Sequence, residues 1–213
     1  MARWAMLIDL RKCVGCETCI EICRQVNRPP PGPPWRRSIE HEIEDNPSGK
    51  RLFVTMSCMH CEKPTCLEVC PTCATYRRPD GIVDIDLNLC LGCGACVVAC
   101  PYQARSIAVS DMMLAQAEKK SQRANVKNKD RIGVCTKCNF CLPHIDAGLA
   151  QGLKPGSDPE ATPRCVRYCL ADALYFGDLD DSESEVSRLI HDNKVVRMQE
   201  ELGTNPSVYY IVP

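Results

Sequence analysis

Cysteine is the residue type whose number and spacing indicate chemistry here, since 18 of the 213 residues are cysteine. The cysteines fall into four groups. The first three are Cys13-x2-Cys16-x2-Cys19-x3-Cys23, Cys58-x2-Cys61-x4-Cys66-x3-Cys70 and Cys90-x2-Cys93-x2-Cys96-x3-Cys100. The fourth contains Cys135, Cys138 and Cys141 and, after a long gap, Cys165-x3-Cys169. Short spacings repeated in this way predict thiolates that bind metal.

The spacing favours iron–sulfur clusters over the other chemistries open to cysteine. Disulfides need an oxidising compartment, and the first ten residues are too short and too early acidic for a signal peptide. Structural zinc uses two CxxC pairs for each ion, which leaves the tightly spaced third and fourth cysteines unexplained. The run C-x2-C-x2-C-x3-C-P, present at Cys90–Pro101, is typical of two-cluster ferredoxins. In that arrangement three cysteines bind one 4Fe–4S cluster and the fourth binds its neighbour.

This crossed ligation predicts four ligand sets and therefore four 4Fe–4S clusters. Groups two and three are adjacent and should pair, and groups one and four should pair across them. The expected sets are Cys13, Cys16, Cys19 and Cys169 for cluster 1; Cys58, Cys61, Cys66 and Cys100 for cluster 2; and Cys90, Cys93, Cys96 and Cys70 for cluster 3. Cysteines of group four with Cys23 would bind cluster 4.

Two of the 18 cysteines are then left without a cluster. An alanine lies at the fourth place after the last cysteine of three groups, at Ala74, Ala104 and Ala173. In this repeat Cys73 occupies the place of Gln103 and Asp172, so we expect it not to be a ligand. In group four, Cys165 should be the third member, and the first two are either Cys135 with Cys138 or Cys138 with Cys141. Spacing alone does not choose between them.

The elements that must position these cysteines indicate an α+β fold of two intertwined two-cluster ferredoxin-like units, with short strands, short helices and long loops. The apolar patterns predict strands at Ala5–Leu10, Leu52–Met56, Ile82–Ile85, Ser106–Val109, Leu174–Phe176 and Val208–Val212. Ser182 and Glu185 resemble a capping box that opens a helix toward His191. The segment 142–164 is expected to be a surface loop, and the basic segment 115–130 a solvated helix face.

These elements suggest how the chain is divided. Residues 1–50 and 105–181 would form an outer unit, split in the sequence around an inner unit at 51–104. Residues 182–213 would form a C-terminal helix and tail that docks a partner. Proline-rich and turn-rich stretches at 27–34 and 46–50 are read as linkers.

The remaining composition excludes several function classes. The net charge of −1 argues against nucleic acid as a partner, and no apolar run approaches the ~20 residues of a membrane span. The four histidines are scattered, and we find no nucleophile motif or glycine-rich phosphate loop, so no catalytic residues are expected. Gly92 and Gly94 are interpreted as letting backbone amides approach cluster sulfurs.

Several motifs resemble the iron–sulfur subunits of the dimethyl sulfoxide reductase family, with similar subunits in polysulfide reductase and phenylacetyl-CoA:acceptor oxidoreductase. They are Ile8-Asp-Leu-Arg-Lys-Cys-Val-Gly-Cys16, Cys70-Pro-Thr-Cys-Ala-Thr-Tyr-Arg-Arg-Pro-Asp-Gly-Ile-Val83, Cys100-Pro-Tyr-Gln-Ala-Arg105 and Lys137-Cys-Asn-Phe-Cys141. The last motif matches the family's opening of group four. The resemblance therefore implies Cys138, Cys141, Cys165 and Cys23 for cluster 4, with Cys135 spare. The sequence departs from the family at Leu170, at Cys73 and in a longer loop before Cys165.

The resemblance implies a non-catalytic electron-transfer subunit. It would relay electrons between a catalytic subunit with a molybdenum or tungsten bis-pterin cofactor and a quinone-reactive membrane anchor or another redox partner. Cluster 1 would lie nearest the catalytic subunit. We expect association with the membrane through these partners and favour the cytoplasmic face. Export together with a signal-bearing partner is the alternative, since the internal Arg36-Arg37 pair is no twin-arginine signal.

Two other function classes would use many of the same cysteines. A stand-alone polyferredoxin would shuttle electrons between soluble enzymes without a stable partner. A zinc scaffold would be colourless and would contain zinc in place of iron.

Overall fold

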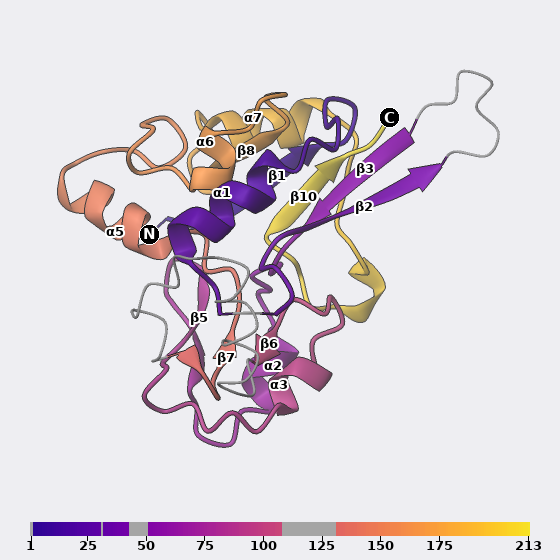
Figure 1. The fold of residues 1–213 in the computed structure, drawn as a ribbon. Helices are drawn as coiled ribbons and strands as arrows, with labels where there is room; N and C mark the ends of the chain where they lie inside the picture. Colours follow the sequence, from indigo (N-terminus) through magenta and orange to yellow (C-terminus); the bar gives the residue numbers. More distant parts are fainter. Residues whose placement is uncertain (1, 31, 43–50, 108–130) are drawn as a thin grey trace.

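The main sheet of the molecule joins the two ends of the chain (Figure 1). The computed structural model describes residues 2–30, 32–42, 51–107 and 131–213. The sheet has the strand order β8-β1-β10-β9. Its strands are β1 (Trp4–Asp9), β8 (Leu174–Asp178), β9 (Val195–Val196) and β10 (Val208–Ile211). Every residue of β1 is buried, as expected of an apolar run with a partner strand on each side.

The C-terminal tail is an interior part of this sheet, which corrects our expectation for it. We expected Val208–Val212 to help dock a partner. Instead β10 pairs in parallel with β1 and antiparallel with β9, and Val208, Tyr210 and Ile211 are at most 1 % exposed. An apolar run at the end of a sequence looks available to a partner, but here the chain's own first strand covers it.

Three two-stranded sheets contain the remaining strands of the described residues. β2 (Arg37–Glu42) pairs with β3 (Arg51–Met56), β4 (Thr75–Arg77) with β5 (Val83–Ile85), and β6 (Ser106–Ile107) with β7 (Cys135–Thr136), all antiparallel. The six strands predicted from the sequence are all present, within two residues at each end that the structure describes. The strands β2, β4, β7 and β9 were not predicted, because they are short or because apolar and polar residues alternate only weakly along them.

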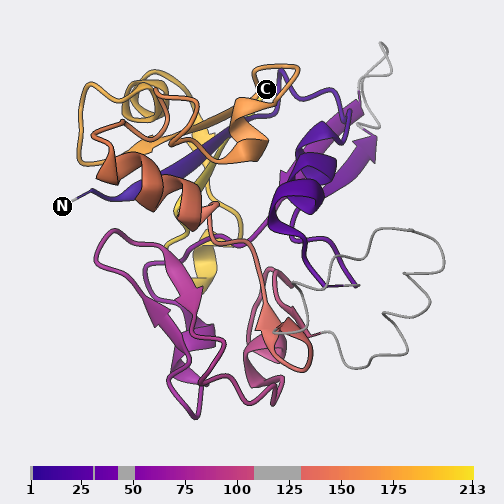
Figure 2. The same ribbon diagram turned by 60° about the vertical axis from the view of Figure 1, so that its left-hand side comes forward.

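Each cysteine group contains or runs into a short helix. These helices are α1 (Thr18–Asn27), α2 (Thr65–Glu68), α3 (Ala95–Val98) and α6 (Arg164–Arg167), and α7 (Glu185–Asp192) and the 3₁₀ helix η2 (Glu200–Leu202) lie further along the chain. α1 packs against α6, although the two are far apart in sequence, and α2 packs against α3. Figure 2 shows α1 and α6 at one end of the molecule and the magenta segment with α2 and α3 at the other.

The segment 142–164 is not a loop throughout, which is a second correction. Helix α5 spans Leu142–Ala150. Pro143 lies in its first turn, where a missing N–H costs nothing, and Gly148 faces Ala161 so closely that a Cβ would lie 2.3 Å from the Ala161 Cβ. The prolines and glycines that indicated a loop therefore serve the start and the packing of a helix.

Helix α7 occurs where it was predicted but begins later. Ser184, and not Ser182, is its N-cap, and its side chain accepts a hydrogen bond from the Ser187 amide at 3.1 Å. The predicted helix at 115–130 lies outside the described residues, as does the whole turn at 46–50. The mixed helices and small sheets confirm the α+β class.

Candidate metal centres

The first predicted set of cysteines lies around one hollow. Its lining includes Cys13, Cys16 and Cys19, which follow β1, together with Cys169, which follows α6. The loop that leads into the hollow is shaped by the buried carboxylate of Asp9. Asp9 accepts hydrogen bonds from the backbone N–H and the side chain of Arg11, each at 2.9 Å, and these bonds lower the pKa of Asp9. The Cys13 amide also donates to the Asp9 carbonyl at 3.1 Å, which closes the turn.

Two further hollows lie at the opposite end of the molecule. The second is lined by Cys58, Cys61, Cys66 and Cys100. The third is lined by Cys70, Cys90, Cys93 and Cys96, and also by Cys135. Glycine is required beside the third hollow, because Gly92 has φ +66° and a Cβ there would lie 1.8 Å from the Gly133 carbonyl oxygen. That close contact between two loops is a reason for Gly92 that the sequence alone did not reveal.

The fourth set is the most deeply buried. It comprises Cys23, Cys138, Cys141 and Cys165, all below 9 % exposed. Asn27 connects two of them, because its side-chain amide donates to the Cys23 and Cys141 sulfurs at 3.5 Å each. Burial raises the pKa of Cys23 to about 12, and Cys138 and Cys141 add to that rise. Thiols from group one and group four are therefore close neighbours.

A repeated turn follows the last cysteine of three groups. Cys73, Gln103 and Asp172 each lie in the left-handed region, with φ of 54°, 49° and 45°. Just after each of these residues, a backbone N–H donates a hydrogen bond to the sulfur of that last cysteine. The bonds run from Thr75 to Cys70 at 3.4 Å, from Ala104 to Cys100 at 3.5 Å, and from Ala173 to Cys169 at 3.3 Å. The alanine repeat of the sequence thus marks a turn that supplies N–H···S hydrogen bonds, which are one means of tuning a cluster.

These sets suit a cluster better than a single ion. Among the described residues, no three His, Cys, Asp or Glu side chains converge closely enough to hold one metal ion. A tetrahedral zinc site would bring its sulfurs to within about 3.8 Å of one another, given a Zn–S bond of about 2.3 Å. Burial raises the pKa of Cys61 to about 12 and also raises that of Cys66, so metal must displace their protons on binding.

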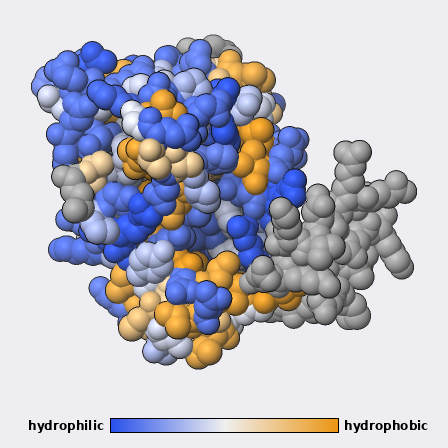
Figure 3. Space-filling view, turned by 90° about the vertical axis from the view of Figure 1, so that its left-hand side faces the viewer, coloured by the Kyte–Doolittle hydropathy of each residue, from blue (hydrophilic) through white to orange (hydrophobic). Residues whose placement is uncertain are grey.

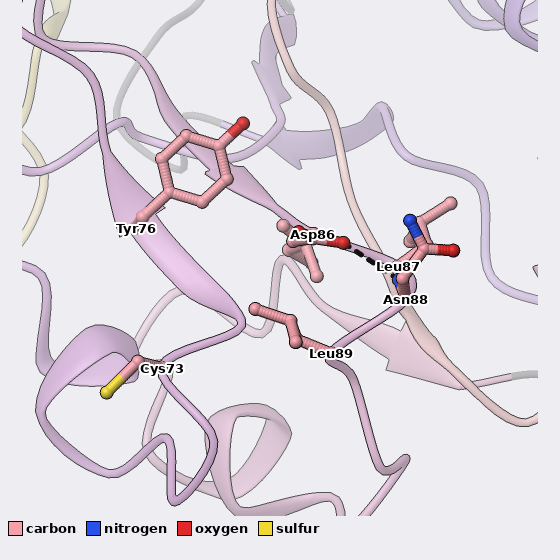
Figure 4. Close-up of a pocket in the computed structure, with 7 residues that line it drawn as sticks. Cys73, Tyr76, Asp86, Leu87, Asn88 and Leu89 are labelled. Carbon is pink, nitrogen blue, oxygen red and sulfur yellow. Dashed lines mark hydrogen bonds between the residues drawn. The ribbon is translucent and has the colours of Figure 1, made fainter.

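Cys73 lies apart from the four sets. It is exposed and lines a separate shallow pocket with Tyr76, Asp86 and Leu89. In Figure 4 its sulfur points away from the other labelled side chains. This placement agrees with the position of Cys73 in the repeat.

Cys135 has a place that the sequence did not predict. It is 1 % exposed and lies beside the third set, where its amide donates to the Cys90 sulfur at 3.4 Å. Hydrogen bonding from its side chain, together with the charge of Arg105, lowers the pKa of Cys96. In the sequence Cys135 is close to Cys138 and was therefore counted in group four. In the fold, strand β7 directs Cys135 toward the third set instead.

Comparisons with known proteins agree with this geometry. Two models described as 4Fe–4S dicluster domains match residues 5–71 and 50–125. A subunit of the selenate reductase of Mesobacillus selenatarsenatis is 39 % identical over 98 % of this chain and 72 % of its own length. A protein of Halobacterium salinarum, named as a presumed iron–sulfur subunit of dimethyl sulfoxide reductase, is 36 % identical over 99 % of the chain and 79 % of its own length. The chain belongs to the iron–sulfur subunits of the dimethyl sulfoxide reductase family.

Membership in this family establishes the chemistry of the chain. An iron–sulfur subunit of an Hdr-like menaquinol oxidoreductase from Archaeoglobus fulgidus is a further relative, 35 % identical over 98 % of the chain and 82 % of its own length. As an iron–sulfur subunit of this family, the chain carries four 4Fe–4S clusters and transfers electrons, and it is not a catalytic subunit. Within the part of the chain that the structure describes, no helix is both long and apolar enough to cross a membrane.

The two extra cysteines lead to a prediction. Cys135→Ala should keep about 16 iron atoms per chain, because the third set has four other cysteines. It should also lower the potential of that cluster, because a hydrogen bond to a sulfur stabilises the reduced state. Iron assay and a redox titration followed by electron paramagnetic resonance (EPR) check this. Cys73→Ala is the matched control and should change neither quantity; loss of a whole cluster from Cys135→Ala would contradict the assignment.

Proposed function

We propose that the four cysteine sets are the ligands of four clusters and that these clusters form one electron path. Cluster 1 would be bound by Cys13, Cys16, Cys19 and Cys169, and cluster 4 by Cys23, Cys138, Cys141 and Cys165. Cluster 2 would be bound by Cys58, Cys61, Cys66 and Cys100, and cluster 3 by Cys70, Cys90, Cys93 and Cys96. The convergence of each set in the fold supports this assignment.

The neighbours of each set suggest the order 1–4–2–3 along the path. Cys19 and Cys165 both favour the charge of Arg36, which supports cluster 1 beside cluster 4. Cys58 raises the pKa of Cys138, which supports cluster 4 beside cluster 2. Cys66 and Cys96 both favour the charge of Arg105, which supports cluster 2 beside cluster 3. This order supports an outer unit at 1–50 and 105–181, wrapped around an inner unit at 51–104.

The observation that carries the relay function is the exposure of the two ends of this path. Cys16 in the first set and Cys93 in the third are exposed, whereas all of the fourth set is buried. Exposed apolar side chains flank both ends: Val14 and Leu170 beside the first set, and Leu91 and Val98 beside the third, each more than 60 % exposed. Figure 3 shows hydrophobic side chains gathered at the end that holds α2 and α3. Electrons therefore have a surface at which to enter and another at which to leave.

We assign a partner to each end. Cluster 1 would face a catalytic subunit with a molybdenum or tungsten bis-pterin cofactor. Cluster 3 would face a quinone-reactive membrane anchor or another redox partner; the relatives named for selenate reductase and menaquinol oxidoreductase support both roles. The complex would associate with the membrane through the anchor, and we favour its cytoplasmic face.

Purification from the native source tests this function. The chain should copurify with a larger subunit that contains molybdenum or tungsten, at one copy of each. The purified complex should contain iron from this chain at about 16 atoms. A chain that purifies alone and still shuttles electrons between soluble enzymes would show it to be a polyferredoxin instead.

A further inference from the structure

Within the described part of the chain, three positively charged side chains are buried without a carboxylate partner. Arg36, Lys137 and Arg105 are 1 %, 3 % and 5 % exposed. None of them takes part in an ion pair among the described residues. Burying an unpaired charge is costly, so each cation needs a compensating anion nearby.

Arg36 lies between the first and fourth cysteine sets. Its guanidinium donates to the hydroxyl of Thr55 at 3.3 Å, and that hydroxyl lies 3.8 Å from the Cys19 sulfur. Burial opposes the charge of Arg36, whereas sulfurs of both sets, Cys165 and Cys19 foremost, favour it, and the pKa of Arg36 is raised. Arg36 is therefore within electrostatic reach of both sets.

Arg105 occupies the corresponding place between the second and third sets. Its guanidinium donates to the hydroxyl of Thr75 at 3.0 Å, and the amide of Thr75 donates to the Cys70 sulfur at 3.4 Å. One of its nitrogens, Nη2, is buried and has no partner within the described residues. Cys66 and Cys96 are among the sulfurs that favour its charge.

Lys137 lies where the two pairs of sets meet. Its ammonium group donates to the carbonyl oxygens of Val83 and, at 3.0 Å, of Cys138 in the fourth set. Val83 in turn lines the second hollow together with Cys66. The ammonium group of Lys137 thus bonds to the backbone of the fourth set and to the backbone that lines the second hollow.

From this placement we propose that the three buried cations alternate with the four clusters, in the order cluster 1, Arg36, cluster 4, Lys137, cluster 2, Arg105, cluster 3. Each cation is the counter-charge of the two clusters beside it and raises the affinity of both for an electron. This proposal rests on the ligand sets proposed above.

The charges explain why such an arrangement would matter. An oxidised cluster with four thiolates carries roughly −2, and reduction adds one negative charge. Buried charges interact strongly, so a cation stabilises the reduced state more than the oxidised state. A cation between two clusters also reduces the repulsion that an electron on one cluster exerts on its neighbour.

Neutral substitutions of the two arginines test the proposal in the holoprotein. Each of the four midpoint potentials is measured by redox titration with EPR, after each signal is assigned to a cluster through a single cysteine variant. At a fixed ambient potential, Arg36→Gln should lower the ratio of reduced to oxidised clusters 1 and 4 at least tenfold, which is 59 mV for one electron. Clusters 2 and 3 should change less than twofold. Arg105→Gln is the matched variant: it should lower the ratio for clusters 2 and 3 at least tenfold and change that for clusters 1 and 4 less than twofold.

Charge-conserving variants separate the charge from the packing of the side chain. Arg36→Lys and Arg105→Lys should keep every ratio within about threefold of the wild type. The proposal is wrong if Arg36→Gln keeps full iron and all four potentials, if it shifts the four equally, or if Arg36→Lys shifts them as far. Should Arg36→Gln lose iron, Arg105→Gln and Lys137→Gln decide the question by the same criteria.

The experiments distinguish a wrong ligand assignment from a wrong charge assignment. A wrong ligand assignment would appear in the cysteine variants, as an altered signal from a cluster outside the predicted set. A wrong charge assignment would appear only in the potentials of variants that retain all four clusters.

Discussion

In a Cys169→Ser variant we expect damage to the cluster built at the other end of the sequence, by Cys13, Cys16 and Cys19. The four sulfurs line one hollow, and the Ala173 amide holds the Cys169 sulfur in place at 3.3 Å. Iron content should fall from about 16 to about 12 atoms per chain if that cluster is lost, or to about 15 if it becomes a three-iron cluster. Anaerobic iron and sulfide assays with EPR measure the difference.

Cys23→Ser is the reciprocal variant. Although Cys23 belongs to group one, it lies with Cys138, Cys141 and Cys165, so the cluster of group four should be damaged and cluster 1 retained. Cys73→Ser provides the control, because Cys73 is exposed and lies outside all four sets. If Cys23→Ser damaged cluster 1 and left cluster 4 intact, the crossed arrangement would be refuted.

The cysteine spacing predicted which residues lie together, because crossed ligation fixes which cysteine groups are neighbours however far apart they are in the sequence. Groups one and four are separated by more than 100 residues, and the rule still predicted that Cys169 lies beside Cys13. Choosing Cys138 and Cys141 over Cys135 required the family resemblance. The structure places Cys135 beside Cys96 instead, and its buried β7 position could not be recognised in two residues of strand.

The buried cations could not be predicted from the sequence. A lysine or arginine is almost always exposed, so Arg36, Arg105 and Lys137 look like ordinary surface charges. Only the fold shows that all three are buried, and that sulfurs from groups remote in sequence favour the charges of Arg36 and Arg105. In the arrangement proposed above, these cations balance part of the negative charge that each cluster adds.

The other wrong or incomplete predictions concern segments whose residue patterns are short or unusual. Helix α5 was read as a loop because Pro143 and Gly148 normally interrupt helices, whereas here one begins the helix and the other permits close packing. The tail at Val208–Val212 was predicted as a strand, but its partner was not. Which strand an apolar run pairs with depends on contacts distant in sequence, and a local pattern does not contain them.

Removing this chain from its complex should abolish electron exchange between the catalytic subunit and quinone. The catalytic subunit should still react with its substrate when artificial dyes supply or accept electrons, because the chain contributes no catalytic residue. The physical reason is distance: on the proposed path the exposed Cys16 and Cys93 belong to the two end clusters, and electrons would reach one from the other only through the two clusters between them. The measurement compares quinone-linked and dye-linked activity of the same preparation with and without the chain.

Loss of a middle cluster should have the same effect while the complex stays assembled. A Cys66→Ala variant that lacks cluster 2 should retain dye-linked activity and lose at least 90 % of quinone-linked activity, since on the proposed path cluster 2 joins cluster 4 to cluster 3. The exposed Cys73→Ala variant should retain both activities. Full quinone-linked activity without cluster 2, or without the chain altogether, would mean that electrons take another path. Turnover of the physiological substrate by the isolated chain would contradict the relay in the opposite way, because it would require a catalytic site that neither the family nor the cysteine chemistry supplies.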